Sequence, residues 1–333
     1  MPIDLNWLNQ VREPILEPEL PIIDPHHHLW DYTDSRYLAD DLIADIRSPS
    51  GAHNVVATVF VECGWSYRKE GPESLRPVGE TEFVERVGAA HENSPIRVAA
   101  GIVGFADLAI GAAVQEVLQA HLAASPKRFR GIRHAAGWHA SDEIRNSHSN
   151  PPPGLFAVPR FREGFAQLKP LGLSFEAWLY HTQLHELLEL ARAFPDTSIV
   201  LDHFGGPLGI GPFVGQSDEV FARWRADTDE LARCPNVVAK LGGLNMAING
   251  YGWHRRPQPP TSQELVNATG RYYLYAIEKF GPARCMFESN FPVDKLSCSY
   301  PVVWNAFKRL ASQASKAEKA ALFHDTAAHI YKV

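Results

Sequence analysis

The chain has 333 residues, of which 45% are hydrophobic and 21% are charged, and its formal net charge is -6. This composition supports a large folded core and excludes a disordered chain. No block of lysine and arginine stands out, which argues against nucleic acid as the main partner. The longest apolar runs are too short to cross a bilayer, so no membrane partner is expected.

The N-terminal region and the cysteines bear on the compartment of the protein. The first twenty residues contain no continuous apolar stretch of the kind that forms a signal peptide. The four cysteines are far apart and have no CxxC spacing, which predicts reduced thiols rather than disulfides. We therefore expect a cytoplasmic protein.

Short apolar segments rich in β-branched residues alternate with longer segments of helical periodicity. Eight short segments predict strands, at residues 21–26, 54–62, 97–104, 129–134, 173–180, 197–203, 236–241 and 284–289. Eight amphipathic segments predict helices, at residues 80–93, 108–124, 160–169, 183–194, 217–233, 263–280, 301–312 and 316–331. This alternation is typical of an α/β fold, the parallel (β/α)8 or TIM barrel. We expect one such domain over residues 1–333, with an N-terminal arm over residues 1–20. An open doubly wound sheet is the alternative, but no GxGxxG follows the first strand.

Two segments interrupt this alternation, after the fourth and seventh predicted strands. Residues 140–159 contain three consecutive prolines, and residues 245–261 are rich in glycine, proline and aromatic residues. Loops after barrel strands build the active site, so these long segments predict a lid or pocket walls. Trp138, just before the first segment, and Trp253, within the second, are expected to shield the site and to contact an aromatic or sugar ring. Simple surface excursions are the alternative interpretation.

Three histidines lie at predicted strand ends. His26 and His28 end the first strand, and strand alternation puts them on one face. His203 ends the sixth strand, before a Gly-Gly-Pro turn. Imidazoles gathered at a barrel mouth can hold one metal ion or polarise one oxygen. A structural hydrogen bond to a backbone carbonyl is the alternative for His203.

Other polar residues at strand ends predict substrate contacts. Arg130 and Arg133 lie three apart in the fourth strand, so only one is expected to point inward, where it suits a carboxylate or oxyanion. Two solvated or ion-paired arginines are the alternative. Tyr180 and His181 end the fifth predicted strand, and Lys240 lies inside an otherwise apolar seventh strand, where its charge needs a partner or a function.

The end of the eighth predicted strand carries further candidate catalytic residues. Glu288 and Asn290 share one face of this strand, and Asp294 follows beyond Pro292. A carboxylate at this place can act as a general base.

Four motifs together resemble the amidohydrolase superfamily, in its branch of sugar-lactone and pyrone-dicarboxylate lactonases. They are Asp-Pro-His-His-His-Leu-Trp-Asp at residues 24–31, Arg-Gly-Ile-Arg at 130–133, Leu-Asp-His-Phe-Gly at 201–205 and Ser-Asn-Phe-Pro at 289–292. The resemblance implies a TIM-barrel hydrolase, with His26, His28 and His203 as the site histidines. It also implies that Arg130 or Arg133 binds substrate oxygens. Members of this branch use one divalent ion or none, and three imidazoles could hold zinc or manganese.

The chain departs from the family motif in the eighth strand. The family usually has Gly-Ser-Asp-Trp-Pro there, whereas this chain has Glu-Ser-Asn-Phe-Pro at residues 288–292. An amide cannot accept a proton from water, so Asn290 cannot be the base. We hypothesise that the carboxylate has moved to Glu288, with Asp294 as the second candidate. Loss of the hydrolytic function is the alternative.

These observations predict an enzyme that opens the lactone of a small carboxylated or hydroxylated compound by water attack. The three histidines, with or without a divalent ion, would polarise the carbonyl, while Glu288 or Asp294 removes the proton. Three alternatives stay open: a metal-dependent decarboxylase of aromatic acids, a hydrolase of amides or acyclic esters, and a non-catalytic barrel that binds a small acid. The expected partner is a small molecule, and a homodimer through the outer helices is also open.

Overall fold

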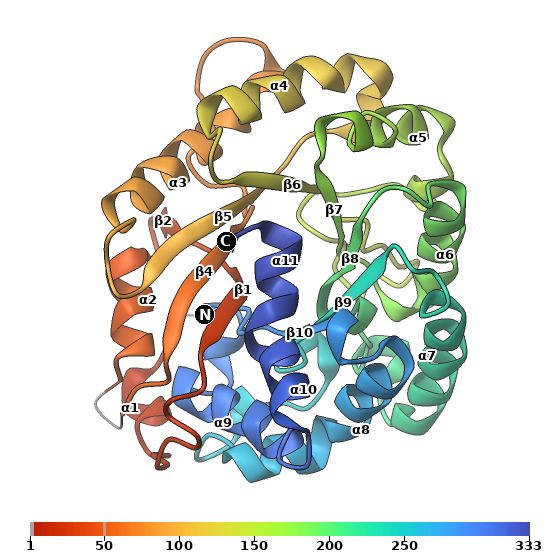
Figure 1. Ribbon diagram of the computed structural model, residues 1–333. Coiled ribbons are helices and arrows are strands. Elements are labelled where there is room, and N and C mark those ends of the chain that lie inside the picture. Colours follow the sequence, from red (N-terminus) through yellow and green to blue (C-terminus); the bar gives the residue numbers. More distant parts are fainter. Residues whose placement is uncertain (1–2, 49–50) are drawn as a thin grey trace.

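Eight parallel strands form the centre of the computed structural model, which describes residues 3–48 and 51–333 (Figure 1). Each of these eight strands pairs with the next of the eight, in the order β1-β4-β5-β6-β7-β8-β9-β10. Between β10 and β1 the barrel closes through a bridge from His27 to Phe291, whose carbonyl accepts a hydrogen bond from the His28 amide at 2.8 Å. The predicted TIM barrel is confirmed. The strands are β1 (Ile22–His27), β4 (Val55–Val61), β5 (Arg97–Gly104), β6 (Phe129–Arg133), β7 (Ser174–Ala177), β8 (Ile199–Leu201), β9 (Val237–Leu241) and β10 (Cys285–Phe287).

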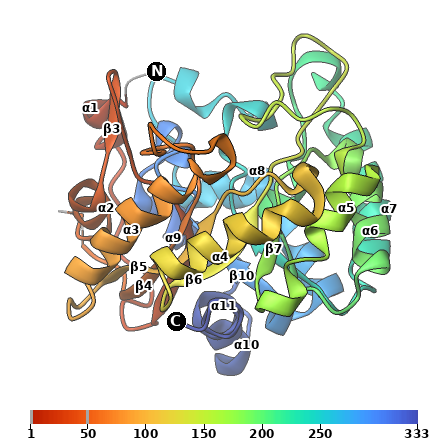
Figure 2. The same cartoon turned by 90° about the horizontal axis from the view of Figure 1, so that it is seen from above.

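Helices surround the barrel and cover one of its ends (Figures 1 and 2). The last two helices lie across the N-terminal ends of the strands, whereas the long loops gather at the opposite end (Figure 2). The helices are α1 (Leu5–Leu8), α2 (Ala39–Ile46), α3 (Val78–Ala90), α4 (Val114–Ala124), α5 (Pro159–Phe165), α6 (Leu184–Ala193), α7 (Ser217–Leu231), α8 (Ser262–Phe280), α9 (Tyr300–Leu310), α10 (Lys316–Ala320) and α11 (Thr326–Tyr331). Within the described part of the chain, no helix is long and apolar enough to span a membrane.

The observed elements differ from the predicted ones in several places, of which three bear on the strand ends, the last helix and the segment after β1. The strands predicted at 173–180 and 197–203 end early, at Ala177 and Leu201, because the chain turns there toward the site. The helix predicted at 316–331 is divided by a π-helical turn over Ala321–Asp325. The hairpin of β2 (Trp30–Tyr32) and β3 (Ser35–Tyr37) and the helix α2 were not predicted, because these elements are short.

The inner face of the barrel changes from apolar to charged along the strands. Valines, Met286 and Tyr331 fill the end of the barrel near α11. Two residues further along the neighbouring strands β8, β9 and β10, the inward positions become charged and stay fully buried. The three steps are Val200 to Asp202, Val238 to Lys240 and Met286 to Glu288. Because side chains alternate along a strand, a spacing of two keeps these charges inside the barrel, just below the loops.

Candidate active site

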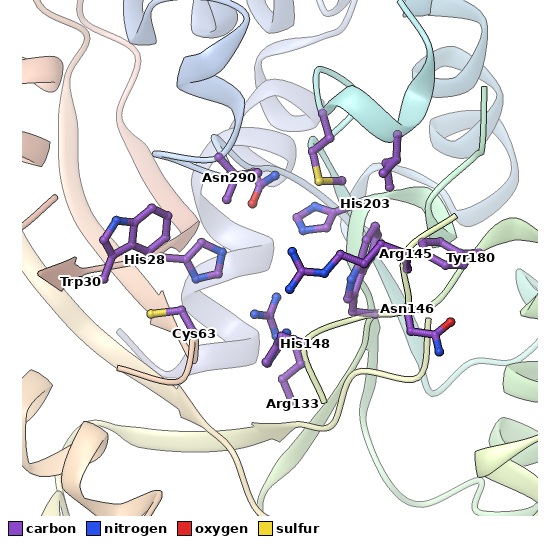
Figure 3. Close-up of a pocket in the computed structure, with 14 residues that line it drawn as sticks. His28, Trp30, Cys63, Arg133, Arg145, Asn146, His148, Tyr180, His203 and Asn290 are labelled. Carbon is purple, nitrogen blue, oxygen red and sulfur yellow. The ribbon is translucent and has the colours of Figure 1, made fainter. Parts of the chain in front are cut away.

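A pocket of about 490 Å³ opens at the C-terminal ends of the strands (Figure 3). It lies where TIM barrels place their active sites. Both long loops contribute to its wall, the first through Arg145, Asn146 and His148 and the second through Met246 and Ile248. This agrees with the expectation that these loops form pocket walls. The lining side chains are His28, Trp30, Cys63, Arg133, Arg145, Asn146, His148, Trp178, Tyr180, His203, Met246, Ile248, Asn290 and Val293.

The structure brings the three predicted histidines together at the base of this pocket. Nε2 of His26 lies 3.3 Å from Nε2 of His28, and the ring centroids of His26 and His203 are 4.5 Å apart. His27 points to the other side of the strand, where its Nε2 lies 2.9 Å from the Thr58 hydroxyl. Nδ1 of His28 donates to the Val61 carbonyl at 2.7 Å, so its Nε2 carries the lone pair. Burial lowers the pKa of both His26 and His28 well below the usual value, so both rings are neutral.

An unusual backbone turn presents His203 to the pocket. His203 and Phe204 have φ values of 52° and 59°, and Gly205 and Gly206 continue in the left-handed region. Non-glycine residues rarely adopt this conformation, and such strain concentrates at functional sites. Two glycines in this turn reduce its cost.

Glu288 lies beneath two of the imidazoles. Its Oε1 is 2.6 Å from Nδ1 of His203, and its Oε2 is 2.8 Å from Nδ1 of His26. The carboxylate is fully buried. Gly242 and Gly243 make this approach feasible, because a Cβ at either position would collide with Glu288 or His203. Glu288 is not among the lining residues, so it acts on the pocket through the histidines rather than directly.

Two carboxylates that the sequence analysis did not select complete the site. Glu62 accepts a hydrogen bond from Nε of Arg133 at 2.7 Å, and its other oxygen is 3.0 Å from Nε2 of His148. Asp202 is fully buried, and neither of its oxygens receives a hydrogen bond from the described residues. Its closest cationic atoms are NH1 of Arg133 at 3.6 Å and Nζ of Lys240 at 3.5 Å. Asp202 therefore keeps acceptor capacity for a further cation.

The donor set around Asp202 fits a divalent metal ion. Ligand atoms of His26, Asp202 and His203 all lie within 4.8 Å of one another. Neutral imidazoles and a carboxylate are typical zinc ligands. The fully buried carboxylates of Glu62, Glu176, Asp202 and Glu288 outnumber the cations of Arg133 and Lys240. His28 adjoins this group through His26, as predicted from the shared strand face.

Lys240 lies below the pocket and not in its wall. Its Nζ is 2.5 Å from Oε2 of Glu176 and 3.3 Å from Nδ1 of His26. The Tyr331 hydroxyl, from α11, donates to the other oxygen of Glu176. Lys240, Glu176 and Tyr331 form a buried cluster, here called the floor cluster. The predicted substrate contact of Lys240 is therefore replaced by an ion pair within the barrel.

Asn290 and Asp294 form a pair at the edge of the pocket. Asn290 lines the pocket, and its side-chain amide donates to Asp294 at 2.9 Å. The backbone amide of Asn290 donates to the His26 carbonyl at 3.0 Å, which places the residue beside the histidines. Its φ of 55° suits asparagine. Asp294 is fully buried behind it, and burial raises the pKa of this carboxyl to about 7. Asp294 is thus positioned to orient Asn290 and not to contact a ligand.

The structure corrects the placement of four predicted substrate-binding residues. Arg130 lies at the opposite end of the barrel, where its Nε donates to the Tyr331 carbonyl at 2.5 Å. Nδ1 of His181 accepts from the Leu208 amide at 3.3 Å, and Trp253 stacks on Tyr251. Trp138 is half-buried outside the lining set. Of the other predicted contacts, Arg133 and Tyr180 do line the pocket.

Other lining residues were missed by the sequence analysis. Arg145, Asn146 and His148 come from the loop after β6, and Met246 and Ile248 come from the loop after β9. Both loops were identified as pocket walls, but their composition gave no means to choose the inward residues. The pairing of Glu62 with Arg133 was also missed, because the two residues are far apart in the sequence.

Comparisons with known proteins agree with this geometry. A family model described as Amidohydrolase matches residues 23–333. An uncharacterised protein of Sinorhizobium fredii is 35% identical, over 95% of this chain and 99% of its own length. The L-fucono-1,5-lactonase of Burkholderia multivorans is 28% identical, over 93% of this chain and 95% of its own length. A crystal structure of a B. multivorans amidohydrolase with bound zinc has a TM-score of 0.71 and 26% identity, and the match covers 94% of this chain and 99% of that one.

Proposed function

The chain belongs to the amidohydrolase family, and on this basis we propose that it hydrolyses the ester bond of a lactone at the mouth of the barrel. The likeness to L-fucono-1,5-lactonase supports this reaction class. The observation that carries the proposal is the position of Glu288, which bridges His26 and His203 directly beneath the pocket.

Glu288 determines which nitrogen of His203 faces the ligand. A carboxylate 2.6 Å from Nδ1 keeps the proton on that atom and leaves the lone pair on Nε2. Without a bound metal ion, Nε2 of His203 can take the proton from the attacking water, while Glu288 stabilises the imidazolium that forms. The carboxylate missing at position 290 is thus replaced by one that acts through an imidazole.

Arg133 supplies positive charge for the oxyanion. Glu62 holds Nε of Arg133 at 2.7 Å, and NH1 lies 3.4 Å from Nε2 of His26. A guanidinium fixed in this way needs no reorganisation when charge develops on the carbonyl oxygen. Asn290, held by Asp294, presents its amide group at the same edge.

A divalent ion would be held by His26, Asp202 and His203. When bound, it would polarise the carbonyl and lower the pKa of a bound water, with Glu288 as the partner that orients the imidazoles. A lone pair on His203 Nε2 is needed in either state, so Glu288 is required with or without the ion.

The test is hydrolysis of L-fucono-1,5-lactone and related sugar lactones in water labelled with ¹⁸O. We expect ring opening with one labelled oxygen in the product carboxylate. Glu288→Gln should lower kcat by about 10³-fold with an unchanged melting temperature, because the variant disturbs proton transfer and not packing. Glu230→Gln, a paired carboxylate on the outer helix α7, is the matched control.

Near wild-type kcat in Glu288→Gln would contradict the role of this residue. Release of carbon dioxide without incorporation of the label would contradict hydrolysis and favour a decarboxylase.

A further inference from the structure

The pocket lining points to an anionic substrate: we propose that the lactone carries a carboxylate and that Arg145 binds it. This inference rests on the proposed function and adds the substrate class to it. It arises from three features of the pocket, namely its charge, the free guanidinium of Arg145 and the rigid attachment of the loop that carries Arg145.

The lining of the pocket is positive although the chain as a whole is negative. The net charge of the chain is -6. Among the described residues that line the pocket there are two arginines and three histidines but no aspartate or glutamate. The carboxylates of the site, such as Glu62 and Glu288, are fully buried behind this lining. A ligand in the pocket therefore meets positive and neutral groups only, which favours an anion.

Arg145 and Arg133 differ in how many of their side-chain hydrogen-bond donors are already engaged by other residues. Two nitrogens of Arg133 are engaged by the side chain and the backbone carbonyl of Glu62. Over residues 3–48 and 51–333, no carboxylate forms an ion pair with Arg145, which is exposed and lines the pocket. Its side chain points into the pocket toward His28 (Figure 3). An arginine offers five donors in a planar fork, which matches a carboxylate.

The backbone on both sides of Arg145 is anchored. The carbonyl of Arg145 accepts a hydrogen bond from the Tyr180 hydroxyl. Ile144 is buried in a small apolar cluster with Tyr180 and Leu208, and the amide of Ser147 donates to the Gly137 carbonyl at 2.8 Å. Little backbone freedom is therefore lost when Arg145 binds a ligand.

The rest of the wall suits the uncharged part of such a substrate. Trp178, Met246 and Ile248 supply apolar surface, while His28 and His203 mark the reacting end. A carboxylate on Arg145 would thus fix the ring with its ester group toward the histidines. Arg145 is a specificity-determining residue in this arrangement, because it contacts a group that does not react.

A matched pair of lactones tests the proposal. D-Glucono-1,4-lactone is neutral at C6, whereas D-glucaro-1,4-lactone carries a carboxylate there. Wild type should show a kcat/KM about 10- to 100-fold higher for the carboxylated lactone, as expected for charge-assisted hydrogen bonds. Arg145→Gln should remove this preference, so that the ratio of the two kcat/KM values falls to about one, whereas Arg145→Lys should retain part of it. Arg233→Gln, on an exposed arginine at the end of α7, is the control and should change neither value.

Binding separates this proposal from the proposed function. Calorimetry measures the affinity of wild type for both lactones. If wild type hydrolyses them during the measurement, the Glu288→Gln variant takes its place. Tighter binding of the carboxylated lactone that is lost in Arg145→Gln supports the subsite, even where neither lactone is hydrolysed and the proposed function fails. Equal binding of both lactones, or a preference that survives Arg145→Gln, overturns it.

Discussion

Arginines at the two ends of the barrel have different partners. At the N-terminal end, Arg130 donates to the backbone carbonyls of Tyr331, Phe129 and Lys127, and its role is complete within the fold. Three residues further along the same strand, Arg133 faces the site and pairs with the buried Glu62. Above it, Arg145 points into the pocket without an ion pair among the described residues.

This comparison separates structural charge from functional charge. A buried cation is stable only with partners, so its hydrogen bonds show what the fold itself uses. Donor capacity left open in a pocket is available to a ligand. The predictions below test this division between the two ends.

The largest effect on stability is expected where the ends meet, at the floor cluster. Lys240→Met leaves Glu176 buried without its cation, which should lower the free energy of unfolding by about 3–5 kcal/mol. Urea denaturation measures this change. The double variant Lys240→Met/Glu176→Leu should recover most of the loss, because it removes both charges. A double variant as unstable as the single one would contradict the role of the ion pair.

The metal-binding group should depend on Asp202. Loss of a residue that only hydrogen-bonds to a metal ligand lowers metal affinity by about 10- to 100-fold. Asp202→Asn removes an anionic ligand itself, so zinc affinity should fall by more than that. Competition with a chelator, followed by metal analysis, measures the affinity directly. Asp294→Asn is the control, since that carboxylate is also buried but lies outside the group. Equal zinc affinity in wild type and Asp202→Asn would exclude Asp202 as a ligand.

A buried acid behind the pocket wall should make stability depend on pH. Oε1 of Glu80 accepts from the Cys63 and Trp65 amides, and burial, with the charge of Glu62, raises the pKa of Glu80 to about 8. Between about pH 4.5 and 8 the folded chain keeps a proton that the unfolded chain releases, so stability falls as pH rises. Glu80→Gln should make the decline shallower by about 1 kcal/mol per pH unit. Urea midpoints from pH 5 to 8 test this, and parallel curves would refute it.

The smallest effect is expected at the N-terminal end. Arg130→Ala removes hydrogen bonds to backbone carbonyls at a half-buried site, so the free energy of unfolding should fall by about 1–2 kcal/mol. The kcat and KM for any lactone should stay unchanged. A specific rise in KM would show that the two ends are coupled and that the division drawn here is wrong.

Much of the architecture could be predicted because its signals are local. Strand β5 was predicted with its observed bounds, and the helices α7 and α8 to within two residues. The histidines at positions 26, 28 and 203 were selected because strand ends meet at one mouth of a parallel barrel. Lys240 was recognised as a charge that needs a partner, but Glu176 was not identified as that partner.

What the sequence by itself determined is the order of strands and helices and the kinds of side chain delivered to each strand end. These follow from the periods of 2.0 and 3.6 residues, which act over short distances along the chain. Only the tertiary structure decided which of these side chains share the pocket. Arg145 reaches the pocket because the Tyr180 hydroxyl holds its loop by a hydrogen bond to the Arg145 carbonyl. Glu288 contacts His203 because Gly242 and Gly243 have no side chains that would collide with them. Such contacts join residues far apart in sequence, and burial and packing select them.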